Sequence, residues 1–165
     1  MVDYFDRFSG AADTALVGLN ARSGLRDTPI CMPRDKVDVA KRSVDVYNRR
    51  DIGAFFAECA TADVEWWPAL TRAYEGGCHR GREGVESFLL DTWDNWEELQ
   101  WVAEEYRDLG DRVLMEGRLS GRGRESGARV DAPAWNLLDF RGDRFWRSRV
   151  YFDRAEALRA AGLSE

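Results

Sequence analysis

Residues 128–153 read ARVDAPAWNLLDFRGDRFWRSRVYFD, two extended runs joined by Arg141-Gly142-Asp143-Arg144. A Gly-Asp pair between two such runs is typical of a two-residue β-hairpin turn. Counting outward from this turn predicts the pairs Phe140–Phe145, Asp139–Trp146, Leu137–Ser148, Trp135–Val150 and Pro133–Phe152. The stretch therefore predicts an antiparallel hairpin near the end of the chain.

Two more extended runs, 99–109 and 112–122, precede this hairpin, so residues 99–153 predict a four-strand meander. Helical patterns lie upstream at 37–47, where an apolar stripe recurs, at 52–59 after the capping residue Asp51, and at 82–98. A strand at 64–67 stops at Pro68, and a closing helix at 154–161 ends at Gly162. Helices followed by a meander indicate an α+β fold, in which helices cover one face of a curved antiparallel sheet.

The chain has 165 residues, a formal net charge of −6 and 44% hydrophobic residues, which fits one folded domain. We expect that domain at 35–165, after an N-terminal extension at 1–34 with weak periodicity. The acidic balance argues against nucleic-acid binding. All but two of the 24 basic residues are Arg, which we interpret as the codon usage of a GC-rich bacterial genome.

The sequence shows no run of about 20 apolar residues and no secretory signal, so we expect a cytoplasmic protein that does not bind membranes. The three cysteines, Cys31, Cys59 and Cys78, form no CxxC pair. His79 is the single histidine. We therefore predict no metal site and no cofactor.

Several strings resemble the NTF2-like superfamily, in particular its SnoaL-like and ketosteroid-isomerase-like branch. They are VAKRSVDVYNRRD at 39–51, DVEWWP at 63–68, HRGREGV at 79–85 and VDAPAW at 130–135. The resemblance implies a cone in which the sheet wraps around the N-terminal helices and encloses a deep apolar pocket. It also implies a homodimer formed through the outer face of the sheet.

The ketosteroid isomerase residues are replaced at each position that the resemblance matches. Ser43 stands where that family has an oxyanion-stabilising Tyr. Trp66 or Trp67 stands at the proton-shuttling Asp, depending on whether the match is counted from Glu65 or from Pro68. Trp135 follows the Ala-Pro string where a protonated Asp would stand. Because that isomerisation needs the base and both donors, we predict that this activity is absent.

The hairpin pairing predicts which side chains face the pocket, because cross-strand partners share a face. One face then carries Trp135, Leu137, Trp146, Ser148, Val150 and Phe152. We predict that Trp66, Trp135, Trp146, Ser148 and Val150 contact a ligand. The opposite face, with Asn136, Leu138, Arg147 and Arg149 among others, suits a dimer interface or a solvated surface.

The acid–base candidates are Glu116 and His79. A turn at Glu125-Ser126 sets Glu116 opposite Trp135 inside the pocket, whereas a one-residue slip turns it out and puts Val113, Met115 and Leu119 in. His79 borders the predicted pocket mouth and titrates near neutral pH. Tyr74 and Asp131 are further candidate ligand contacts at that rim.

Two functions remain open from the sequence. The first is a SnoaL-like protein that binds a small hydrophobic or aromatic molecule in the cone without ketosteroid isomerase chemistry. The second is a polyketide-cyclase-like or isomerase-like enzyme that transfers protons through Glu116 or His79. A cavity of several hundred Å³ with a buried carboxylate or His favours the enzyme, and a cone plugged by Trp66, Trp135 and Trp146 argues against it.

Overall fold

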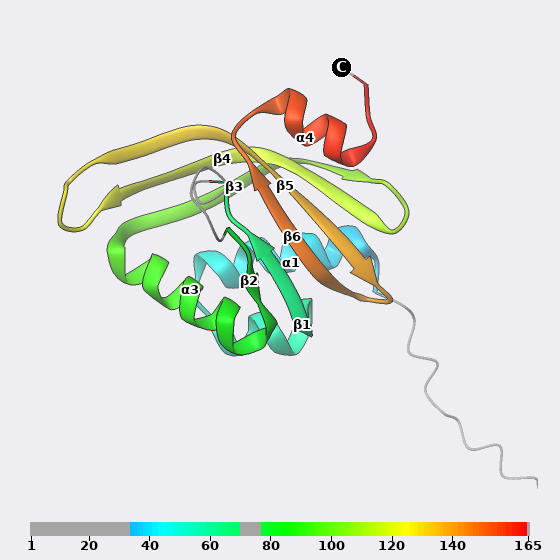
Figure 1. Ribbon diagram of the computed structural model, residues 1–165, viewed down its shortest axis with the longest axis horizontal. Helices are drawn as coiled ribbons and strands as arrows, with labels where there is room; N and C mark the ends of the chain where they lie inside the picture. The colour runs from blue at the N-terminus through cyan, green and yellow to red at the C-terminus, as the bar shows by residue number, and fades with distance from the viewer. Residues whose placement is uncertain (1–33, 70–76, 165) are drawn as a thin grey trace, which may run out of the picture. The chain divides into compact units, whose positions relative to one another are not determined.

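The computed structural model describes residues 34–69 and 77–164, which lie in one compact unit (Figure 1). The predicted extension at 1–34 lies almost wholly outside the described residues and stays a prediction. The helical elements are α1 (Lys36–Asn48), α2 (Ile52–Ala54), the π-helical turn η1 (Phe55–Cys59), α3 (Gly81–Asn95) and α4 (Arg154–Ala161). The strands are β1 (Ala60–Trp67), β2 (His79–Arg80), β3 (Trp96–Asp108), β4 (Arg112–Gly123), β5 (Arg129–Arg141) and β6 (Arg144–Tyr151).

The described strands form one sheet in the order β2-β1-β6-β5-β4-β3. All neighbouring pairs are antiparallel except β1 and β6, which run parallel. In Figure 1, α1 and α3 lie on one side of this curved sheet and α4 on the other. The predicted α+β cone is confirmed, with one parallel pair in the sheet that was predicted to be antiparallel.

Local signals explain the helix boundaries. Asp35 caps α1 by accepting a hydrogen bond from the Val37 amide, and Asp51 caps α2 by accepting one from the Ala54 amide. Asp153 caps α4, which ends at Gly162 with a left-handed φ of 74°. The helices predicted at 37–47, 52–59 and 154–161 are found beside these caps. The helix predicted at 82–98 ends at Asn95, because Trp96 begins β3.

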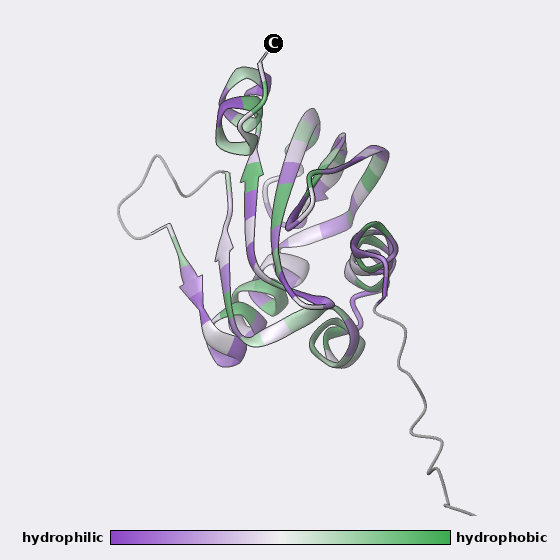
Figure 2. Cartoon of the chain, turned by 90° about the vertical axis from the view of Figure 1, so that its right-hand side faces the viewer, coloured by the Kyte–Doolittle hydropathy of each residue, from purple (hydrophilic) through white to green (hydrophobic). Residues whose placement is uncertain are grey.

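The inner face of the sheet and the helices enclose the larger hydrophobic core. Buried side chains of α1, α3 and η1, such as Val39, Leu89 and Phe55, pack against Val113 and Leu138 of the sheet. Figure 2 shows hydrophobic and hydrophilic residues alternating along the strands, as expected when the two faces of a sheet have different neighbours. This core surrounds the candidate site.

A second core lies on the outer face, where α4 packs on the sheet. Leu158 and Ala161 of α4 contact a cluster that includes Leu114, Trp135 and Tyr151. The closing helix therefore covers part of the face through which the sequence predicted a homodimer. The dimer itself stays a prediction.

The hairpin of β5 and β6 has the predicted turn but not the predicted register. Gly142-Asp143 is the turn and Phe140 pairs with Phe145, as expected. The register then shifts, so that Asp139 pairs with Arg147 rather than with Trp146, and Trp135 pairs with Tyr151 rather than with Val150. Trp146 is the extra residue of a β-bulge. Because side chains alternate between the two faces of a sheet, each β6 residue after the bulge shares a face with the β5 residue next to the predicted partner.

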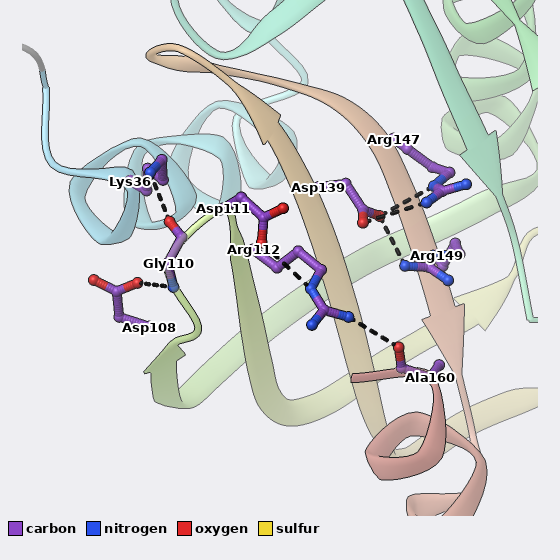
Figure 3. A network of polar contacts seen from close by, with 9 residues as sticks. All are labelled: Lys36, Asp108, Gly110, Asp111, Arg112, Asp139, Arg147, Arg149 and Ala160. Atoms are coloured by element: carbon purple, nitrogen blue, oxygen red, sulfur yellow. Dashed lines mark hydrogen bonds and ion pairs between the residues drawn. The ribbon is translucent and has the colours of Figure 1, made fainter. Parts of the chain in front are cut away.

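The outer face beside α4 carries a buried carboxylate. The side chain of Asp139 is only 10% exposed and accepts hydrogen bonds from Arg147 and Arg149 of β6 (Figure 3). Arg112 of β4 donates to the Ala160 carbonyl at the end of α4 and so ties this helix to the sheet. No helix in the described part of the chain is both long and apolar enough to span a bilayer.

Candidate functional site

A cavity of about 370 Å³ lies between the helices and the inner face of the sheet. It is closed by α1 and α3 on one side and by β1 and β3–β6 on the other. Its walls are mostly apolar, and aromatic rings from six elements line it, including Tyr47, Phe55, Trp66, Phe88, Trp101 and Phe145. A cavity of this size and lining is typical of a small-molecule site.

The rings pack against one another and hold the walls in place. Tyr47 and Trp66 are stacked with 6.4 Å between ring centroids and an interplanar angle of 6°. Phe55 contacts Trp66 and Phe145 at 6.0 Å and 5.6 Å. Because aromatic pairs of this kind add to the energy of burial, the cavity is bounded by an ordered wall.

Two buried polar residues of the sheet, Asn136 on β5 and Ser148 on β6, interrupt the apolar interior. A third, Ser43 of α1, also lines the cavity, but its hydroxyl donates to the Ala40 carbonyl. Asn136 lines the cavity and is 8% exposed, and Ser148 is fully buried behind it. The Ser148 hydroxyl donates a hydrogen bond of 2.9 Å to Asn136 Oδ1. The pair faces inward because the bulge at Trp146 brings Asn136 opposite Val150.

Tyr47 adds a second polar group to the wall. Burial raises the pKa of its phenol to about 12, although the nearby Arg50 charge acts in the opposite direction. The hydroxyl therefore stays protonated at physiological pH. In the cavity Tyr47 is a hydrogen-bond donor or acceptor and not a base.

Charged groups are scarce around the cavity. Among the described residues that line it, none is Lys, Arg or His, and the one carboxylate is the exposed Asp91 near the end of α3. Asn95 and Thr92 lie near Asp91, and their side chains donate to backbone carbonyls of α3. The interior is therefore neutral, with polar groups of α3 at one edge.

Within residues 34–69 and 77–164, no three His, Cys, Asp or Glu side chains come together in a way that would hold a metal ion.

The structure places only some of the predicted ligand contacts at the cavity. Trp66 and Val150 line it, and Ser148 lies directly behind Asn136. Trp67, the alternative to Trp66, instead donates its indole N–H to Glu65. Of the two candidates, Trp66 and not Trp67 forms part of the cavity wall.

Trp135 and Trp146 were predicted on the pocket face, and this placement is wrong. Trp135 packs in the outer core under α4. Trp146 is the bulge residue and lies between the guanidinium groups of Arg141 and Arg147, at 4.2 Å and 4.4 Å from its ring centroid. The hairpin was counted without a bulge, and Asn136 takes the inward position expected for Trp135.

The acid–base candidates do not meet in the cavity. Glu116 pairs with Trp135, as one of the two predicted registers requires, but both residues lie on the outer face, where Glu116 is 3.9 Å from Arg107. Met115 and Leu119 line the cavity instead, as in the other register. Glu116 therefore does not reach a bound ligand.

His79 of β2 lies behind the wall. Its ring stacks on Phe88 with 4.2 Å between centroids, and Phe88 rather than His79 lines the cavity. Burial lowers the pKa of the imidazole. Asp131 forms an exposed ion pair with Arg118, away from the cavity, and Tyr74 lies outside the described residues.

Sequence reasoning missed Asn136 and Tyr47 as cavity residues. Asn136 was assigned to the outer face because the bulge was not foreseen. Tyr47 was recognised only as part of the apolar stripe of the first helix. A lone Asn within the apolar run of β5 is the signal that points to a buried polar site, since an unpaired buried amide is costly.

The chain belongs to the SnoaL-like domain family, whose profile matches residues 40–148. This match covers most of the described domain, from α1 to the middle of β6. A comparison with curated protein sequences finds no match.

Solved structures share the fold at low sequence identity. A ketosteroid isomerase-like protein from Catenulispora acidiphila, in complex with trimethylamine, has 18% identity and a TM-score of 0.61 over 77% of this chain and 94% of its own. TerC, co-crystallised with polyporic acid, has 21% identity and a TM-score of 0.62 over 77% and 98%. A candidate SnoaL-like polyketide cyclase from Jannaschia has 19% identity and a TM-score of 0.61 over 79% and 93%. At these identities the likeness establishes the fold alone.

Proposed function

We propose that this SnoaL-like protein binds a small, uncharged, largely aromatic molecule in the cone. The observation that carries the proposal is the cavity of about 370 Å³ with aromatic walls and a neutral interior. Burial of a flat apolar molecule against these rings provides the binding energy. Trp66 lines this cavity and does not fill it, which supports a binding site over a cone plugged by tryptophans.

The lack of positive charge in the described lining favours an uncharged ligand over an anion. A carboxylate that enters an apolar cavity loses its hydration, and no lining Lys, Arg or His among the described residues replaces it. The aromatic faces are compatible with neutral molecules and tolerate a cation. Trimethylamine and polyporic acid in two structures of this fold support a role in small-molecule binding.

Proton transfer through Glu116 or His79 has less support. Glu116 is on the outer face and His79 lies behind Phe88. A general base must reach its proton directly or through one water. Among the described residues of the cavity wall, Asp91 is the one carboxylate, and it is exposed. We therefore favour binding without acid–base chemistry.

Quenching of tryptophan fluorescence tests the proposal, because Trp66, Trp96 and Trp101 line the cavity. We expect 9-fluorenone, a flat neutral tricyclic ketone, to quench the fluorescence in a saturable way. Val150→Phe fills the cavity and should weaken this binding at least tenfold. Val102→Phe is the matched control, because Val102 is 50% exposed and does not line the cavity.

Equal loss of fluorenone binding in both folded variants would place the ligand elsewhere. Unaltered binding in Val150→Phe would do the same. If neither fluorenone nor other flat neutral aromatics quench the wild-type protein in a saturable way, the proposed function is wrong.

A further inference from the structure

The pair of Asn136 and Ser148 is a buried polar feature of the sheet side of the cavity. From its geometry we propose that Asn136, oriented by Ser148, recognises the ligand by donating a hydrogen bond from Nδ2. The ligand then carries a carbonyl-type acceptor at the end that enters the cone first. This inference rests on the proposed function, because it concerns the same cavity. It narrows the ligand class from flat neutral aromatics to flat neutral aromatic ketones, quinones or similar acceptors.

The amide of Asn136 has donors that no described residue uses. An Asn side chain has one acceptor oxygen and an NH₂ group with two donors. The oxygen Oδ1 already accepts from the Ser148 hydroxyl at 2.9 Å. In the described part of the chain, no group accepts a hydrogen bond from Nδ2. The donors of Asn136 are thus available while its acceptor is occupied.

The free NH₂ group of Asn136 is accessible from the cavity. Asn136 lines the cavity. Its Nδ2 has no partner among the described residues, yet it is not one of the fully buried polar atoms without a partner, so it has accessible surface. The nitrogen is therefore reached from the cavity. Its neighbours across β4, β5 and β6 are Met115, Leu138 and Val150, which offer no side-chain acceptor other than the weakly accepting Met thioether.

Ser148 orients this amide. Its side chain is fully buried, and its hydroxyl makes no other hydrogen bond among the described residues. The hydroxyl donates to Oδ1, which turns NH₂ toward the cavity. The reverse orientation of the amide would leave the buried Ser148 O–H without an acceptor among the described residues. Ser148 is thus a positioning residue, which acts on the ligand only through Asn136.

Ligand specificity follows from the free-energy cost of leaving the NH₂ group of Asn136 without an acceptor. An acceptor that reaches Nδ2 satisfies a buried group, whereas a hydrocarbon edge or an N–H at the same place leaves it unpaired. One neutral hydrogen bond changes affinity by roughly three- to tenfold. The cone should therefore discriminate between molecules of the same shape by a single atom.

Three probes of one shape test this discrimination. 9-Fluorenone has a carbonyl acceptor, fluorene a methylene group and carbazole an N–H donor at the same position of the same tricycle. We expect equilibrium dialysis against wild-type protein to show fluorenone bound roughly three- to tenfold more tightly than fluorene, with carbazole no tighter than fluorene.

Variants assign the discrimination to the two residues. In Asn136→Leu, fluorenone and fluorene should bind equally. In Ser148→Ala the amide is free to turn its oxygen inward, so carbazole should gain affinity relative to fluorene. Ser120→Ala on β4 is the control, because Ser120 does not line the cavity, and it should leave the order of the three probes unchanged.

The outcomes separate the two proposals. If fluorenone and fluorene bind wild type equally, or carbazole binds best, the inference on Asn136 is overturned while the proposed function survives. If none of the three probes binds, the proposed function fails and the inference fails with it. The wild-type comparison decides even where a variant does not fold.

Discussion

Asp139 shows at the scale of single residues how the outer face is held together. Its carboxylate is nearly buried and accepts from Arg147 and Arg149 at 3.1 Å and 2.8 Å. Arg149 Nε is itself buried without a partner among the described residues, so Asp139 compensates the positive charge of this guanidinium group. Breaking such a pair leaves partly buried guanidinium groups uncompensated.

We expect Asp139→Ala to lower the free energy of unfolding by about 2–4 kcal/mol, as measured by urea denaturation. Asp131→Ala is the control, because the Asp131–Arg118 pair is exposed and should contribute less than about 1 kcal/mol. A loss in Asp139→Ala no greater than in Asp131→Ala would contradict the interpretation.

His79 should make stability depend on pH. Burial lowers its pKa below the ordinary value of 6.5, so the unfolded chain binds this proton more tightly than the folded one. Stability is then lost as the pH falls through about 6.5 and levels off below the folded-state pKa. His79→Phe keeps a ring against Phe88 without a titrating group. The urea midpoint should fall less between about pH 7.5 and pH 5.5 in this variant than in wild type, and identical slopes would refute the assignment.

The candidate site was only partly predictable at this scale. Trp66 and Val150 line the cavity as predicted from the positions that the family resemblance implies, although the pairing of Val150 with Trp135 was wrong. Trp135 and Asn136 are adjacent in the chain, so an error of one residue exchanged a cavity side chain for an outer one. Burial does not distinguish the two registers, since both residues are buried.

At the scale of secondary-structure elements, the helices followed from the sequence better than the strand pairing did. Caps at Asp35, Asp51 and Asp153 depend on contacts within three residues, which the sequence shows directly. Bulges depend on packing between strands. The bulge in β3 contains Glu98 with a left-handed φ of 52°, and it lets both Trp96 and Leu99 line the cavity although they are three residues apart.

Gly117 allows β3 to pass close to β4. A Cβ at this position would lie 2.0 Å from the Val102 carbonyl oxygen, a backbone atom that cannot move away without breaking the sheet. We expect Gly117→Ala to destabilise the fold by about 3 kcal/mol or more, seen as a large fall in Tm. Gly84→Ala in α3 is the matched control, with nothing within 4 Å of its new Cβ, and should raise stability by up to about 1 kcal/mol. A wild-type Tm in Gly117→Ala would show that β3 is not held this close.

At the scale of the whole molecule, the homodimer that the resemblance implies stays a prediction. The outer face is shared between α4 and ion pairs such as Arg118–Asp131, so a partner would use the surface of β6 and β1 beside α4. We expect light scattering after gel filtration to give twice the chain mass of 18.9 kDa. A wild-type protein with the mass of one chain would contradict the dimer.

The central claim is that the cone holds a neutral aromatic acceptor against Asn136. A crystal structure of the protein grown with 9-fluorenone tests it most directly. We expect the tricycle among Trp66, Trp101 and Phe145, with its carbonyl oxygen at about 2.9 Å from Asn136 Nδ2. A tricycle bound outside the cavity, or one inside it with the carbonyl turned away from Asn136, would contradict the account.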